Sequence, residues 1–173
     1  MMIIIPPPAN ESFGYFDKYL QKVQYEDLIE GLKDSSEAFL NFIDKISDRQ
    51  LDFRYQLGKW NIREIVQHII DCERVFSYRA LTFARKDKTA LPGFEENDYA
   101  KESNSSNRDI TDLMIEFKTV RKATVELYKS FDEAMIDAKG TANNNELSVR
   151  AIGFIIIGHA AHHQEIIKEK YLH

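Results

Sequence analysis

The stretch that decides the fold is Ala151-Ile-Gly-Phe-Ile-Ile-Ile-Gly-His159-Ala-Ala-His162-His163-Gln-Glu-Ile-Ile167, near the end of the sequence. Its apolar residues recur at three- and four-residue steps without a proline, which predicts a long amphipathic helix. Because an α-helix turns about 100° per residue, His162 lies roughly 60–80° away from the two imidazoles at the centre of the apolar arc, at the edge of that arc. That arc is about 120° wide and contains Ile152, Ile155, Ile156, His159, His163, Ile166 and Ile167.

Two imidazoles, those of His159 and His163, therefore lie in the middle of an apolar stripe. A neutral imidazole tolerates burial when both ring nitrogens have hydrogen-bond partners, so one interpretation is a pair of ordinary core histidines. Side chains four residues apart also reach one point above a helix, which is the spacing of paired histidines in zinc sites. The pair alone leaves both interpretations open, and a third ligand elsewhere would favour metal binding.

Three more segments show helical periodicity. One capping box, Asn61-Ile-Arg-Glu64, opens the second of them, while Asp109 or Thr111 caps the third and Ser148 caps the C-terminal helix. No segment has the pattern of a β-strand. We therefore expect an all-α protein, a four-helix bundle with helices at about 25–46, 61–85, 109–131 and 148–171.

The segments between these helices suggest how the bundle is connected. Residues 86–108 show no helical period, so we expect a long crossover loop that gives the bundle an up-down-down-up order. Its aromatic residues Phe94 and Tyr99, with Glu95, Glu96 and Asp98, suit a lid over a site, although a flexible surface crossover fits equally well. Residues 1–12, with three prolines, should form an extended arm. We expect residues 1–173 to form a single domain.

Composition narrows the functional classes. The formal net charge is −5, the pI is about 5.6, and no basic cluster stands out, which argues against binding to nucleic acid or to an anionic membrane. The single cysteine, Cys72, excludes an intrachain disulfide and fits a reducing compartment. We find no signal peptide and no apolar run approaching the roughly 20 residues of a membrane span. We therefore expect a cytoplasmic protein.

A third histidine can join the pair. His68 lies at the border of an apolar stripe between Ile65 and Cys72, so it can point into the bundle, where metal sites are built from side chains on facing helices. Asp71, and less well Glu73, could orient an imidazole from outside the ligand set. Cys72 is either a core residue or, less often, a ligand or a reactive thiol.

Several of these motifs resemble the DinB/YfiT-like superfamily of metal-dependent enzymes, whose best-described branch comprises bacillithiol transferases. The resemblance covers nearly the whole chain. It rests mainly on Gly58-Lys-Trp-Asn-Ile-Arg-Glu-Ile-Val-Gln-His68-Ile-Ile-Asp71-Cys-Glu73, on Leu91-Pro-Gly-Phe94-Glu-Glu-Asn-Asp98-Tyr99, and on Gly158-His159-Ala-Ala-His162-His163. It implies a four-helix bundle, often a homodimer, that holds one nickel or zinc ion on His68, His159 and His163.

The resemblance also implies an activity. Three neutral imidazoles leave a divalent ion one open position, where it can lower the pKa of water or of a thiol. We expect transfer of a low-molecular-weight thiol to a small electrophilic substrate, with Arg150 as a candidate partner for a carboxylate of the thiol. A metal-dependent hydrolase on the same site and a non-catalytic, dimeric binding module related to stress are the alternatives.

Overall fold

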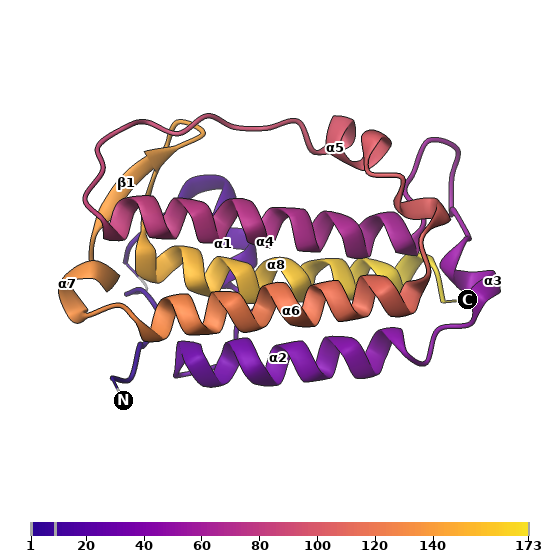
Figure 1. Cartoon of the computed structure of the whole chain (residues 1–173), viewed down its shortest axis with the longest axis horizontal. Coiled ribbons are helices and arrows are strands. Elements are labelled where there is room, and N and C mark those ends of the chain that lie inside the picture. The colour runs from indigo at the N-terminus through magenta and orange to yellow at the C-terminus, as the bar shows by residue number, and fades with distance from the viewer. Residues whose placement is uncertain (1, 9, 173) are drawn as a thin grey trace.

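The protein is described by a computed structural model that covers residues 2–8 and 10–172. Within these residues four long helices form the body of the molecule (Figure 1). They are α2 (Leu28–Ile43), α4 (Ile62–Ala84), α6 (Ile110–Lys129) and α8 (Val149–Lys170). The shorter elements are the 3-10 turns Gly14–Phe16 and Ser105–Asn107, the helices α1 (Asp17–Leu20), α3 (Asp48–Leu51), α5 (Glu96–Glu102) and α7 (Glu133–Ile136), and the strands β1 (Lys139–Ala142) and β2 (Asn145–Ser148).

The long helices pack as a square. Helix α4 lies against α6 and α8, and α2 lies against the same two helices, so α2 and α4 occupy opposite corners. Figure 1 shows that α2 and α8 run in one direction while α4 and α6 run in the other, because the chain crosses back along the bundle between α4 and α6. The predicted four-helix bundle with up-down-down-up order is confirmed.

The predicted caps are present. Asn61 accepts a hydrogen bond from the backbone N–H of Glu64 at 2.9 Å, and Glu64 accepts one from the backbone N–H of Asn61 at 2.7 Å. The carboxylate of Asp109 accepts from the N–H of Thr111, and the Ser148 hydroxyl accepts from the N–H of Ala151. These bonds satisfy donors that have no partner inside a helix, which is why the starts of α4, α6 and α8 were readable from the sequence.

The expectation that no segment forms a strand was wrong. Strands β1 and β2 pair in antiparallel register across a turn at Asn143 and Asn144, whose φ angles are 48° and 61°. Asparagine tolerates this left-handed conformation, which a tight hairpin turn requires. Four-residue strands containing a glycine and charged residues have little strand pattern. The backbone N–H of Leu91 also donates to the carbonyl of Thr141, so the hairpin anchors the start of the crossover.

The crossover itself is more ordered than expected. Residues 86–108 were predicted to be a loop without helical period, yet they contain α5 and a 3-10 turn, and α5 contacts α4. The carboxylate of Glu95 accepts a hydrogen bond from the N–H of Asn97 and caps α5. One turn or two of exposed helix has almost no apolar stripe, so periodicity could not reveal it.

Residues 2–8 of the N-terminal arm form neither helix nor strand, whereas Met1 and Ala9 lie outside the described residues. Ile4 is buried, and its backbone N–H and carbonyl bond to the side chain of Asp27 and the N–H of Leu28. None of the helices within residues 2–8 and 10–172 combines the length and apolarity that crossing a bilayer requires.

After the arm, α1 packs on α8 through its backbone. A Cβ atom added to Gly158 would lie 2.0 Å from the carbonyl oxygen of Tyr19, closer than atoms can approach. The glycine before His159 therefore lets the aromatic segment around Tyr19 reach the histidines.

Substituting Gly158 tests this close approach. Gly158→Ala should lower the free energy of unfolding by about 1–3 kcal/mol, because overpacking against backbone outweighs the better helix propensity of alanine. Gly153→Ala is the control on the same helix, where the added Cβ meets the flexible end of Leu28. Urea denaturation should show a smaller loss for the control; equal stability of Gly158→Ala and wild type would contradict the contact.

Candidate metal centre

Three imidazoles meet where α4 faces α8. His68 comes from α4, and His159 and His163 come from successive turns of α8. The Nε2 atom of His159 lies 3.1 Å from the Nε2 atoms of both His68 and His163. Three Nε2 atoms from two helices thus face one small volume. The ring of His162 packs edge-on against Tyr19, and among the described residues its nitrogens make no hydrogen-bond contact with the other three imidazoles.

Burial keeps these rings neutral. Burial lowers the pKa of His68 to about 4. Burial also lowers the pKa values of His159 and His163 well below the usual value, and the neighbouring imidazoles lower these two further. At neutral pH each ring therefore has one nitrogen with a free lone pair. A neutral imidazole is the form that ligates metal.

The donor set fits a cation better than it fits hydrogen bonding. An imidazole Nε2 either donates or accepts, so the Nε2 atom of His159 cannot be a good hydrogen-bond partner for the Nε2 atoms of His68 and His163 at the same time. A divalent ion accepts the lone pairs of all three. Imidazole suits zinc and nickel alike, so the ligands do not identify the metal.

Cys72 is also part of this cluster. It lies one turn after His68, and its Sγ atom is 3.6 Å from both ring nitrogens of that histidine. Ligand atoms of His68, Cys72 and His159 all lie within 4.8 Å of one another, so this trio could hold a metal as well. The thiol is buried, and burial raises its pKa, so without a metal it is protonated and unreactive at neutral pH.

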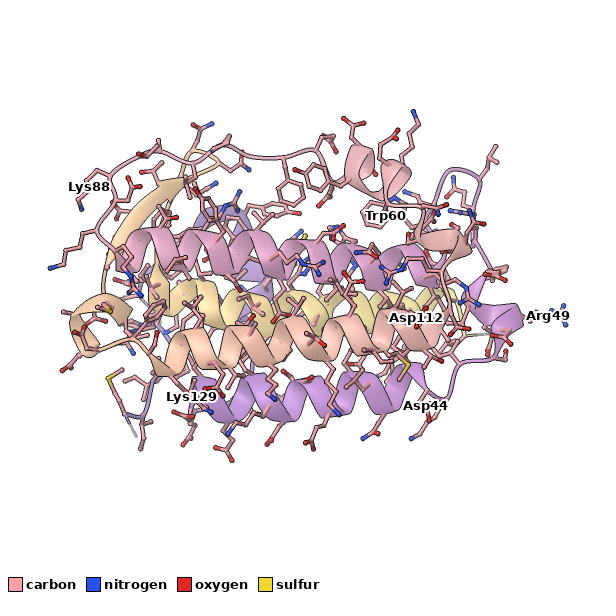
Figure 2. All side chains as sticks on the ribbon, in the orientation of Figure 1. Asp44, Arg49, Trp60, Lys88, Asp112 and Lys129 are labelled. Carbon is pink, nitrogen blue, oxygen red and sulfur yellow. The ribbon has the colours of Figure 1, made fainter. Side chains whose placement is uncertain are left out.

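Aromatic rings enclose the imidazoles. The ring of Tyr19 lies 5.2 Å from His159 and that of Phe76 6.0 Å from it, both edge-on. The indole of Trp60 lies 4.8 Å from the ring of His68. Trp60, which precedes the capping box, forms part of the wall of the site. Figure 2 shows Trp60 at the end of the bundle where α4 begins, close to α5.

A carboxylate from the crossover also reaches the cluster. The Oε2 atom of Glu96 in α5 lies 3.9 Å from Nε2 of His68. Partial burial and the charge of Glu95 raise its pKa. The acidic composition of the crossover suggested a lid, but its spacing could not single out Glu96, because α5 itself was not foreseen.

The other residues predicted in the crossover lie near each other but are not in the imidazole cluster. Phe94 packs against the core, and its ring lies 4.9 Å from that of Tyr99, whose side chain is half exposed. Their predicted role in contacting substrate stays a prediction.

Two predicted residues have other partners. Arg150, at the start of α8, donates to the carboxylate of Asp137 and to the carbonyl of Ile5, so it holds the N-terminal arm, and its predicted role with a carboxylate of a thiol stays a prediction. Glu73 is 2% exposed and is bonded at both carboxylate oxygens by Arg121, at 2.8 and 2.9 Å. Glu73 therefore stabilises the core. It does not orient an imidazole, because Arg121 bonds both of its carboxylate oxygens.

Asp71 also has partners of its own. Its carboxylate accepts a hydrogen bond from Gln67 at 2.9 Å and lies 3.6 Å from the guanidinium of Arg74. Within the described residues it makes no hydrogen bond to an imidazole of the cluster. The predicted role of Asp71 in orienting His68 stays a prediction.

Replacing Glu73 tests whether its ion pair with Arg121 serves the stability of the core or the metal centre. Glu73→Gln should lower the free energy of unfolding by about 3–5 kcal/mol, because Arg121 would keep its charge in a buried position. It should leave metal content unchanged in the folded protein. Urea denaturation and metal analysis measure the two effects, with Glu126→Gln as a control that breaks an exposed pair and should have little effect on either. If the folded Glu73→Gln variant lost its metal, Glu73 would have a role at the metal centre after all.

Known proteins resemble this chain over most of its length. Residues 32–167 match the model of the DinB superfamily. A protein of Oceanobacillus iheyensis named "putative metal-dependent hydrolase" is 27% identical over 154 residues, which is 86% of this chain and 87% of that protein. A protein of Geobacillus thermodenitrificans with the same description is 27% identical over 111 residues, 63% of this chain and 61% of that protein.

A solved structure has the same fold. YfiT from Bacillus subtilis, described as "a probable metal-dependent hydrolase with an unusual four-helix bundle topology", superposes with a TM-score of 0.71. The match covers 94% of this chain and 89% of that one at 19% sequence identity. At this identity the likeness establishes the arrangement of the helices.

Proposed function

Because the chain belongs to the DinB superfamily, we propose that it is a metal-dependent hydrolase whose divalent ion is held by His68, His159 and His163. The convergence of the three Nε2 atoms is the observation that supports this most directly. The descriptions of the relatives from Oceanobacillus and Geobacillus support the same reaction class. Cys72 lies close enough to serve as a further ligand.

The side chains around the cluster can each serve a different role in hydrolysis. When bound, a divalent ion on three imidazoles supplies a Lewis acid and lowers the pKa of water at its open position. The carboxylate of Glu96 faces the same volume and can hold the proton that an attacking water releases. Tyr19, Phe76 and Trp60 surround the imidazoles and exclude bulk water, which strengthens charge interactions at the reacting atoms.

Thiol transfer is the second candidate. The ammonium of Lys18 lies 4.8 Å from the ring of Tyr19, which itself lies 5.2 Å from the ring of His159, so a cation lies one aromatic ring away from the cluster. Such a cation suits the carboxylates of an acidic low-molecular-weight thiol. Thiol-dependent consumption of monobromobimane or of an epoxide, in the presence of zinc or nickel, would distinguish transfer from hydrolysis. A dimeric binding module without activity would show neither reaction at any metal loading.

Metal content tests the ligand set. Protein purified without a histidine tag should contain about one divalent ion per chain, and His163→Ala should lose most of it, since one of three imidazole ligands is removed. His162→Ala is the matched control, because His162 is next to His163 in the sequence but its own ring lies outside the cluster. Inductively coupled plasma mass spectrometry gives the stoichiometry. Equal metal loss from both variants, or a folded wild type that binds none, would refute the assignment.

Hydrolytic activity tests Glu96. Glu96→Gln keeps the size of the side chain but cannot accept a proton, so kcat should fall by about 10²-fold or more, the usual contribution of a general base. Glu102→Gln changes a carboxylate on the same short helix, and we expect it to keep wild-type activity and metal content. Activity on an ester panel, together with metal analysis of both variants, makes the comparison. Unchanged kcat in Glu96→Gln would exclude the proposed role.

A further inference from the structure

A small pocket opens beside the imidazoles at the end of the bundle where α4 begins. Its volume is about 210 Å³, and His163 forms part of its wall. The other walls come from segments far apart in the sequence: the connection before α4, the helices α4, α5 and α8, and the C-terminal end. The apolar side chains among them are Tyr55, Trp60, Ile65, Ile166 and Tyr171.

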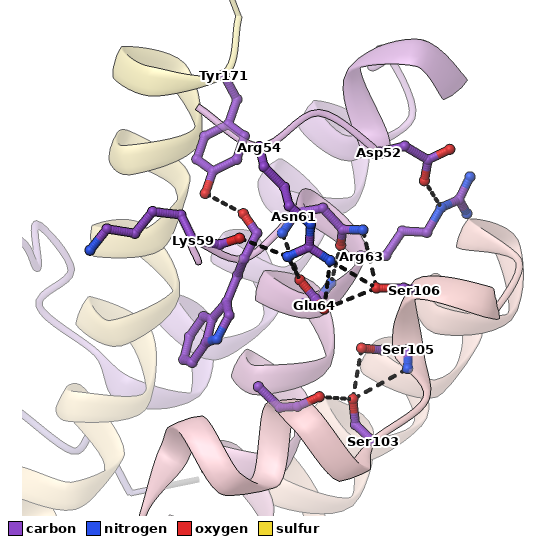
Figure 3. Close-up of polar contacts among 12 residues, drawn as sticks. Asp52, Arg54, Lys59, Asn61, Arg63, Glu64, Ser103, Ser105, Ser106 and Tyr171 are labelled. Carbon is purple, nitrogen blue, oxygen red and sulfur yellow. Dashed lines mark hydrogen bonds and ion pairs between the residues drawn. The ribbon is translucent and has the colours of Figure 1, made fainter. Parts of the chain in front are cut away.

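The walls are held in place before any ligand binds. The hydroxyl of Tyr171 donates to the carbonyl of Trp60 at 2.6 Å, and the ring of Tyr55 lies 5.2 Å from that of Tyr171. Arg54 donates to the carbonyl of Lys59 and pairs with Glu64 in the capping box, which ties the connection to the first turn of α4 (Figure 3). A preformed pocket loses little conformational entropy on binding.

The lining indicates what the pocket accepts. It contains three aromatic rings and two isoleucines, with Lys59, Asn97 and His163 as the polar members and no carboxylate among them. Burial raises the pKa of Tyr171 to about 12, so this phenol stays neutral. A cationic group would find no counter-charge here. An aromatic ring fits, since a cavity of about 150 Å³ lined by apolar side chains holds benzene.

We propose that this pocket binds an aromatic ring of the substrate and places the ester or amide group attached to that ring beside His163. The inference rests on the proposed function, which it deepens: the substrate class becomes a small aromatic ester or amide. The Asn97 side chain, from the same helix as Glu96, can donate a hydrogen bond to a polar group at the edge of the pocket.

The chain offers a direct probe, because Trp60 is its only tryptophan. Benzamide should change the fluorescence of Trp60 in a saturable way, and acetamide, which lacks the ring, should bind at least about tenfold more weakly. Ile166 is a half-buried residue of the pocket wall, so the larger side chain of Ile166→Phe fills the pocket. This variant should bind benzamide at least about tenfold more weakly. Ile115→Phe is the matched control, since Ile115 is exposed on α6 and should leave binding unchanged.

The outcomes separate this pocket from the reaction. Saturable binding of benzamide that is lost in Ile166→Phe supports the pocket even if no ester is hydrolysed, which would refute only the proposed function. If the protein is an active hydrolase but benzamide leaves Trp60 unchanged, or Ile166→Phe binds it normally, the pocket is refuted. A Trp60 signal that responds to dilution instead of benzamide would show a second copy covering the pocket and would also refute it.

Two further measurements strengthen the test. If Ile166→Phe fails to fold, Asn97→Phe fills the pocket from an exposed position on α5 and should have the same effect. In active, metal-loaded enzyme, benzohydroxamate should inhibit at least about tenfold more strongly than acetohydroxamate, because both bind a metal but only the first fills the pocket. Equal inhibition by the two compounds would contradict the proposal.

Discussion

The packing of α4 against α8 is the contact on which the site depends. It buries His68 and His159 to 4% exposure each within a wall of aromatic and aliphatic side chains. Burying polar rings without good partners costs free energy, and three Nε2 atoms that face one another are poor partners in the absence of an ion. A bound cation would offset this cost, so metal binding would stabilise the same helix contact that creates the site.

The short elements outside the bundle complete the site. The crossover brings Glu96 over the end of α4, and the hairpin holds the start of that crossover through Leu91. The connection before α4 supplies Trp60, and the N-terminal segment supplies Tyr19. The histidines thus lie on rigid helices, while the groups that could contact substrate come from connecting segments. This division is common in enzymes, because a rigid scaffold positions groups that loops can vary.

How much of the fold and of the site could be predicted from the sequence depended on how far apart in the chain the interacting residues lie. The caps at Asn61, Asp109 and Ser148 are local, so the starts of α4, α6 and α8 were predictable. His159 and His163 share one helix, so their convergence followed from its geometry. Glu73 was misjudged because its partner Arg121 lies 48 residues away. The partner of Arg150 in the N-terminal arm was also out of reach of local patterns, since Ile5 lies 145 residues away in the chain.

The sequence by itself therefore determined the helices, the up-down-down-up order and the candidate histidines, because helical periodicity and capping act within a few residues of chain. Only the tertiary structure decided that Glu96 approaches His68 and that an aromatic pocket adjoins His163. These groups come together through packing between segments far apart in the chain. No short-range pattern records such contacts, since each depends on how whole helices are placed against one another.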